Sequence, residues 1–266
     1  MRFCAFASGS SGNCIYTGSE TTHVLVDVGI SGKRIENALN DIELTGRDLS
    51  GILITHEHSD HIGGLGVISR KYGIPIYATA ETLDAITKDK ATGVIDEQLF
   101  VPIVADKKFM IGDLTINPMR ISHDAANPLA YRISCENKKV AVCTDLGTFD
   151  EYTVDCLSNM DALLIEANHD IKMLQVGPYP YPLKQRILGN RGHLSNEASG
   201  RLLSRILHDG TKKVFLGHLS QENNLPDLAY EAVRLEITMS EENNYRGDDF
   251  NISVAKRSEP SELIEI

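Results

Sequence analysis

Three histidines and an aspartate fall within six consecutive positions of this chain, as His56, His58, Asp60 and His61. They follow closely on the apolar run Gly51–Ile54. Imidazoles packed this tightly are costly unless something compensates them. A metal does so, because neutral imidazole is the commonest metal-ligating side chain. The segment therefore indicates a metal site.

The directions of these side chains favour two ions rather than one. In an extended segment, alternate side chains point to the same side, so His56 and His58 can hold one ion together. Asp60 and His61 come after the expected turn and point elsewhere. One ion cannot easily take all four side chains, and the pattern therefore predicts two ions side by side.

Three further candidate ligands stand in similar settings downstream. His123 follows the run Met119–Ser122, Asp145 ends an apolar strand, and His218 follows the apolar run Val214–Gly217. Each lies where a loop leaves the carboxyl end of an expected strand, which is the usual place for active sites in α/β proteins. Mixed imidazole and carboxylate ligation suits Zn, Mn or Fe and does not choose among them.

Apolar runs and turn signals predict the elements that must position these residues. Strands are expected at Phe3–Ala7, Ile15–Thr17, His23–Val28, Gly51–Thr55, Ile74–Ala78, Leu114–Pro118, Ala130–Cys135, Lys139–Cys143, Ala162–Ile165 and Lys213–Leu216. Helices are expected at Leu65–Tyr72, at Ala80–Lys88, between an N-cap at Ser195 and a stop at Gly210, and from Pro226 onward. This order predicts a layered α/β fold in one domain, residues 1–266, with a flexible tail after about residue 256.

Composition limits the kind of protein. With 42% apolar and 24% charged residues, the chain can bury an ample core. The net charge of −11 counts against a surface that binds nucleic acid everywhere, but it permits a local basic groove. No apolar run is long enough for a transmembrane helix, and the first residues are too short a stretch for a signal peptide. The five cysteines form no CxxC pair, so we expect reduced, mostly buried thiols and a cytoplasmic protein.

The complete motif His56-x-His58-x-Asp60-His61 resembles the HxHxDH signature of the metallo-β-lactamase-fold hydrolases. The resemblance implies an αββα sandwich, a four-layer α/β fold with its site at one edge of two sheets. It also implies two divalent ions. Their ligands would be His56, His58 and His123 for the first, Asp60, His61 and His218 for the second, and Asp145 as a bridge. Asp27 would orient a ligand imidazole from behind, although an Asp before a Gly can also be a plain turn residue.

One segment points to the phosphodiesterase branch of this family. His193, in Gly192–Ala198, is similar to the His-x-Ser/Thr segment of ribonuclease Z and ribonuclease J. The resemblance implies that His193 faces the scissile phosphate and stabilises charge or protonates the leaving oxygen. The alternative is a histidine that merely contacts solvent near a helix start. Glu166 matches an acidic position of the nuclease branches and would position His193 or the ligands, unless it is only a capping or salt-bridge residue.

Two further segments could contact substrate phosphates. Between Ile171 and His193 there are four basic residues and no acidic one, which suits a nucleic-acid backbone, although an ordinary solvated loop would look the same. The loop Ser8–Cys14 is rich in small residues and suits an anion, although a plain hairpin loop is equally compatible. The candidate phosphate contacts are Ser8, Ser10, Ser11, Asn13, Lys184, Arg186 and Arg191.

Four segments together resemble the bacterial YycJ/WalJ/VicX group, namely Phe6–Asn13, Asp27–Ser31, Thr55–His58 and Gly217–Asn223. This resemblance implies metal-dependent hydrolysis of DNA, as a 5′-to-3′ exonuclease. A bridging hydroxide would attack phosphorus while Asp60 accepts or orients its proton and His193 assists the departing oxygen. We expect DNA rather than RNA as the partner and no membrane association, and the oligomeric state stays open.

Other functions remain compatible with these residues. A small-molecule hydrolase of the same fold, such as a thioesterase of the glyoxalase II kind, would suit the acidic net charge. A ribonuclease, or a regulatory binding protein with a structural metal site, would use the same ligand pattern.

Overall fold

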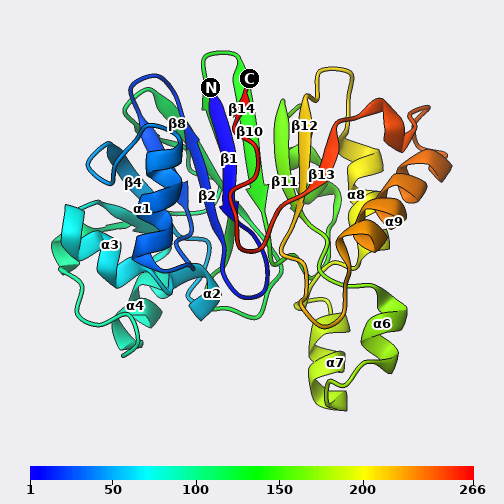
Figure 1. The fold of residues 1–266 in the computed structure, drawn as a ribbon, viewed down its shortest axis with the longest axis horizontal. Coiled ribbons are helices and arrows are strands. Elements are labelled where there is room, and N and C mark those ends of the chain that lie inside the picture. The colour runs from blue at the N-terminus through cyan, green and yellow to red at the C-terminus, as the bar shows by residue number, and fades with distance from the viewer.

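Two seven-stranded sheets face each other in the computed structural model, which describes residues 1–266 (Figure 1). The first sheet has the order β14 (Ile264–Glu265), β1 (Arg2–Ala7), β2 (Cys14–Gly18), β3 (His23–Val26), β4 (Leu49–Leu53), β5 (Ile76–Ala78) and β6 (Phe100–Pro102). The second has the order β13 (Ile252–Val254), β12 (Lys213–Gly217), β11 (Ala162–Glu166), β10 (Lys138–Cys143), β9 (Leu129–Cys135), β8 (Leu114–Arg120) and β7 (Phe109–Ile111).

The alternation of side chains along each strand builds two cores at once. In β1, Phe3 and Ala5 point into the cluster between the sheets, where they meet residues such as Phe215 of β12. Cys4 and Phe6 point the other way, into the cluster under the helices of the first sheet. Because both faces of these strands are buried, they read as continuous apolar runs.

Helices cover the outer faces of both sheets, which confirms the predicted αββα arrangement (Figure 1). The first sheet carries α1 (Gly32–Asp41), α2 (Ser59–Ile62), α3 (Leu65–Tyr72) and α4 (Ala80–Lys88). The second carries α5 (Glu151–Leu157), α8 (Asn196–Ile206) and α9 (Pro226–Met239), while α6 (Ile171–Val176) and α7 (Tyr181–Leu188) project from its lower end. Single 3₁₀ turns occur at Glu97–Leu99 and Gly247–Asp249.

The predicted helices at Leu65–Tyr72 and Ala80–Lys88 form with those bounds. Ser195 is the N-cap of α8, since its hydroxyl accepts a hydrogen bond from the backbone N–H of Ala198 at 3.2 Å. The helix ends earlier than Gly210, at Ile206. The sequence did not reveal α1, α2, α5, α6 or α7, because each begins in a polar or proline-containing stretch where apolar periodicity is weak.

The C-terminal segment lies differently from expectation. Instead of a loose tail, residues 256–266 run from β13 across to the first sheet and end in β14, which pairs with β1 (Figure 1). The backbone N–H of Ser261 donates to Ala5 O at 2.8 Å, and Lys213, buried in β12, contacts Glu262. Long-range pairing with β1 overrides the polar composition of this segment.

All five cysteines are free thiols, and four of them are buried. The longest helix, α9, has 14 residues, and no helix combines the length and apolar character needed to cross a membrane.

Candidate metal centre

The candidate ligands gather at one edge of the two sheets because the strands that carry them end there. β3 and β4 run parallel in the first sheet, and β10, β11 and β12 run parallel in the second. Three residues within two positions of a strand end have left-handed backbones, with φ of 59° at Asp27, 57° at Asp145 and 55° at His218. Such backbones cost of order 1 kcal/mol or more in residues other than glycine and cluster at functional sites.

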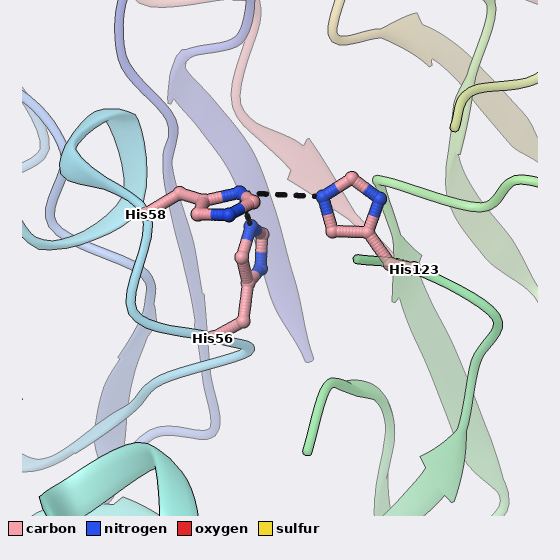
Figure 2. Close-up of side chains that lie close together, drawn as sticks. All are labelled: His56, His58 and His123. Carbon is pink, nitrogen blue, oxygen red and sulfur yellow. Dashed lines mark hydrogen bonds between the residues drawn. The ribbon is translucent and has the colours of Figure 1, made fainter. Parts of the chain in front are cut away.

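The first group of ligands is a triangle of imidazoles (Figure 2). His56 Nε2 lies 3.0 Å from His58 Nδ1, which lies 3.3 Å from His123 Nε2. On its other side, His123 Nδ1 lies 3.1 Å from the carbonyl oxygen of Gly192. A carbonyl only accepts, so Nδ1 carries the hydrogen and Nε2 turns a lone pair towards the other two rings.

The second group joins imidazoles to carboxylates. His218 Nε2 lies 3.2 Å from Asp60 Oδ2 and 3.4 Å from Asp145 Oδ1. His61 Nε2 lies 3.0 Å from Asp145 Oδ2 and 3.5 Å from Asp60 Oδ2. Asp145 thus stands between the groups, since its Oδ1 is also 3.6 Å from His123 Nε2. All seven predicted ligands converge on one small volume.

Residues behind the ligands decide which ring nitrogen faces inward. Asp27, fully buried, accepts from His61 Nδ1 at 2.7 Å, and it also accepts from the backbone N–H and the hydroxyl of Thr55, both at 2.8 Å. Glu166 accepts from His218 Nδ1 at 3.0 Å. Each carboxylate holds a hydrogen on the outer nitrogen and leaves the Nε2 lone pair to the centre, as metal-ligating histidines require.

The charges of the two groups differ. Burial, and then the imidazole of His61, hold the pKa of His56 well below its ordinary value. Burial opposes charge on His218 too, but the carboxylates of Asp145 and Asp60 outweigh it and raise the pKa of His218 to about 10. His56 therefore offers a neutral lone pair, and the second group offers carboxylate oxygens that attract positive charge.

This donor set fits divalent metal ions. Asp145 Oδ2 is buried and has no hydrogen-bond partner, although His61 Nε2 lies 3.0 Å away. A divalent cation bound between these two atoms would satisfy both. The imidazoles of His56, His58 and His123 likewise turn nitrogens towards one another. Neutral imidazole and carboxylate are the ligands of Zn, Mn and Fe sites.

His193 lies against this centre. Its Nδ1 donates to Glu166 Oε1 at 2.8 Å, and its ring stacks on that of His218 with centroids 5.3 Å apart. Its side chain is 16% exposed, so the ring reaches solvent. Burial disfavours the charged form, but Glu166 outweighs it and raises the pKa of His193. The ring can therefore hold a proton close to the centre.

The loop between β1 and β2 holds two of the predicted phosphate contacts out of reach. Ser8 is buried, and its hydroxyl accepts from the backbone N–H of His218 at 2.9 Å and donates to Asn13 Oδ1 at 3.1 Å. Asn13 is also buried, 3.3 Å from His61 Nε2. Both predictions of phosphate contact are wrong, because these side chains are buried and contact the ligand residues His218 and His61. Ser10 and Ser11 are exposed on the same loop.

The predicted basic residues are largely committed to internal contacts. Lys184 Nζ donates to the carbonyls of Gln175 and Gly177, both at 2.7 Å, and closes the turn between α6 and α7. Arg186 forms a two-pronged ion pair with Asp124, the neighbour of His123. Arg191 donates to the backbone carbonyl of His123 at 3.0 and 3.1 Å. Their phosphate-binding roles stay predictions, and Arg186 and Arg191 hold the segment around His123.

Sequence reasoning missed Asn168. This buried side chain donates to the backbone carbonyl of His218 at 3.0 Å and helps to hold the left-handed turn there. It follows Glu166 at the end of β11, so the rule that located the other candidates at strand ends also applied to it.

Comparison with known proteins agrees with this geometry. A β-lactamase superfamily domain matches residues 22–218. The chain is 43% identical over 230 residues to exodeoxyribonuclease WalJ of Streptococcus pneumoniae, which covers 86% of both chains. It is 41% identical over 229 residues to exodeoxyribonuclease YycJ of Bacillus anthracis, again over 86% of both. The structure is similar to that of the metallo-β-lactamase fold protein YhfI of Bacillus subtilis, with a TM-score of 0.71 over 98% of both chains at 16% identity.

Proposed function

Because this chain belongs to the β-lactamase superfamily, we propose that it is a metal-dependent exodeoxyribonuclease. The assignment is supported above all by the 43% identity to an exodeoxyribonuclease over 86% of both chains. In this function, His193 beside the ligand cluster would donate the proton that the leaving oxygen of a phosphodiester takes up. We further propose the 5′-to-3′ direction, a preference for DNA over RNA, and a cytoplasmic location.

The residues that would hold two divalent ions are His56, His58 and His123 for one, Asp60, His61 and His218 for the other, and Asp145 for both. Bound there, the ions would supply a hydroxide nucleophile at neutral pH and neutralise charge on the phosphoryl oxygens. Zn, Mn and Fe all suit these ligands.

The chain contributes orientation and proton transfer. Burial opposes ionisation of Asp60, but His61 and His218 outweigh it and hold the pKa of that carboxyl well below its ordinary value. Asp60 therefore stays a carboxylate, which suits it to orient the attacking oxygen by accepting a hydrogen bond. Its side chain is 23% exposed, at the solvent-facing side of the centre.

His193 would act on the leaving group. Glu166 keeps a hydrogen on Nδ1, so the protonated ring has its second hydrogen on Nε2. Donation of that proton to the departing 3′-oxygen would let the P–O bond break without forming a free alkoxide. Glu166 also holds His218, so one carboxylate sets the relative position of the proton donor and a metal ligand.

The test is a side-by-side assay of the purified protein with Mn²⁺ or Zn²⁺ on 5′-labelled and 3′-labelled duplex DNA, matched RNA and a thioester. We expect shortening of 5′-phosphorylated DNA from its 5′ end. His58→Ala removes one corner of the imidazole triangle, and cleavage should disappear.

His208→Ala is the matched control, because this histidine lies after α8 and contacts Met160 O, away from the centre. It should leave cleavage unchanged. Cleavage that persists in His58→Ala, or thioester hydrolysis without loss of DNA, would reject the assignment.

A further inference from the structure

The C-terminal segment brings a cation to the rim of the metal centre. Arg257 Nη2 donates to the carbonyl oxygen of Leu219 at 2.9 Å, one residue beyond His218. Its Nη1 lies 3.4 Å from the hydroxyl of Ser10, in the loop between β1 and β2. Figure 1 shows the segment crossing from β13 towards β14 beside β1. Residues that are 247 positions apart in the sequence thus meet at the site.

The backbone around Arg257 is held in place. Immediately before it, the N–H of Ala255 donates to Leu216 O at 2.8 Å and the carbonyl of Lys256 accepts from Ser8 N at 3.1 Å. The guanidinium of Arg34 in α1 donates to the carbonyl of Arg257 at 3.3 Å. The arginine is therefore presented by a fixed strap and not by a loose terminus.

Arg257 forms no salt bridge within the chain; burial lowers the pKa of its guanidinium, and the nearby carboxylate of Glu222 opposes that shift. Its neighbour Lys256 pairs with Glu259, and Arg186 on another part of the rim pairs with Asp124. No carboxylate lies within ion-pair distance of Arg257, although the chain has a net charge of −11. A guanidinium has five donor hydrogens, and the contacts to Leu219 and Ser10 leave several of them free.

The loop beside it is shaped for close approach. A side chain at Gly9 would place its Cβ 3.0 Å from Arg257 Nη1, so the glycine lets the guanidinium lie against the loop backbone. Ser10, whose hydroxyl contacts Arg257, and its neighbour Ser11 are both exposed. Guanidinium and hydroxyl donors at one point are the groups that recognise phosphate oxygens.

On the basis of the proposed DNA hydrolysis, we propose that Arg257, together with Ser10 and Ser11, binds a phosphate of the DNA strand next to the cleaved bond. Arg186 is paired with Asp124, whereas Arg257 lies beside His218 without a salt bridge of its own. The bound group is either the terminal 5′-phosphate or the neighbouring diester.

The experiment compares wild type, Arg257→Gln and the matched control Lys256→Gln. The control removes the same charge at the neighbouring residue, which forms an exposed salt bridge with Glu259. All are loaded with Mn²⁺ and assayed on labelled duplex DNA and on bis(p-nitrophenyl) phosphate, a small diester without a second phosphate. For Arg257→Gln we expect KM for DNA to rise about tenfold. The slope of log KM against log salt concentration should fall by roughly the amount that one lost phosphate contact accounts for. Activity on the small diester, bound metal and the control variant should match wild type.

Modified DNA separates the two sources of the phosphate. If the terminal group is bound, the effect of Arg257→Gln disappears on 5′-hydroxyl DNA. If the diester is bound, the effect persists there and disappears when a neutral methylphosphonate replaces the second internal linkage, which follows the cleaved bond. Arg257→Lys, which keeps the charge, should fall between wild type and Arg257→Gln in either case.

Three outcomes would overturn the assignment of Arg257. They are an unchanged KM for DNA in Arg257→Gln, an equal defect in Lys256→Gln, and a loss of bound metal, since the last would mean that Arg257 only supports His218. A wild-type protein that hydrolyses the small diester and leaves DNA intact would instead reject the DNA substrate itself. The two failures are therefore distinguishable.

Discussion

At the scale of single residues, neighbours decide which histidines can bind metal. His23 is an ordinary buried histidine, because its Nδ1 contacts the hydroxyl of Tyr16 at 2.9 Å and burial lowers its pKa. His61 and His218 differ, since a carboxylate behind each ring keeps the outer nitrogen protonated and turns the inner one to the centre. The residue type is the same, and the second hydrogen-bond partner makes the difference.

His193→Ala tests the proton donor directly. The variant should keep its bound metal but lose about 10²–10⁴-fold in kcat on DNA, because the 3′-oxygen would leave without a proton. Bis(p-nitrophenyl) phosphate has a leaving group that needs no proton, so its hydrolysis should change little. Metal analysis and kcat for both substrates are the measurements. Equal losses on both substrates would mean that His193 positions the centre and donates no proton.

At the scale of elements, helix faces and strand ends position the site. α8 is capped by Ser195, two residues after His193, and buries Leu202, Leu203 and Ile206 against the second sheet. The N-cap and this apolar face together hold the start of the helix, and hence His193, against the ends of β11 and β12. The left-handed residues after β3, β10 and β12 then turn their side chains into the gap between the sheets.

A leucine-to-alanine substitution should have different effects on a buried helix face and on an exposed one. Leu203 of α8 is fully buried, whereas Leu235 of α9 is 53% exposed. Leu203→Ala should lower the free energy of unfolding by about 2–5 kcal/mol because it leaves a cavity. Leu235→Ala should change it by no more than about 0.5 kcal/mol. Chemical denaturation measures both, and similar losses in the two variants would contradict the packing described here.

At the scale of the whole molecule, the candidate ligands come from both sheets. His56, His58, Asp60 and His61 follow β4 of the first sheet, whereas His123, Asp145 and His218 follow β8, β10 and β12 of the second. Between the sheets, the shared apolar cluster around Phe3 and Phe215 holds them together. Ions bound at the edge of this interface would join the two sheets in addition to the apolar cluster between them.

Removal of metal should therefore destabilise the fold. After treatment with a chelator, Tm should fall, and adding Mn²⁺ or Zn²⁺ at 100 times its Kd should restore about 2.7 kcal/mol of stability per site. Thermal unfolding with and without metal measures the effect. His58→Ala should respond less than wild type, because it lacks one ligand. A Tm that does not depend on metal in the wild type would argue against ions that join the sheets.

Local patterns predicted much of the fold and the core of the site. The helices at Leu65–Tyr72 and Ala80–Lys88 follow from the spacing of apolar residues, which local geometry alone dictates. The helices α6 and α7 escaped prediction, because α6 starts at an Asp170 cap and α7 after a run of prolines, where periodicity is weak. In the sequence, Ser8 and Ser10 were equally good candidates for phosphate contact. In the structure, Ser8 is buried and Ser10 is exposed.

The sequence by itself indicated a metal site, since the types and spacing of His56, His58, Asp60 and His61 are those of metal ligands. Only the tertiary structure decided what surrounds that metal. It buried Ser8 and Asn13, engaged Lys184 and Arg186 internally, and carried Arg257 from the far end of the chain to the rim of the site. The physical reason is that ligand type is a property of each residue, whereas burial and charge pairing depend on contacts between distant segments.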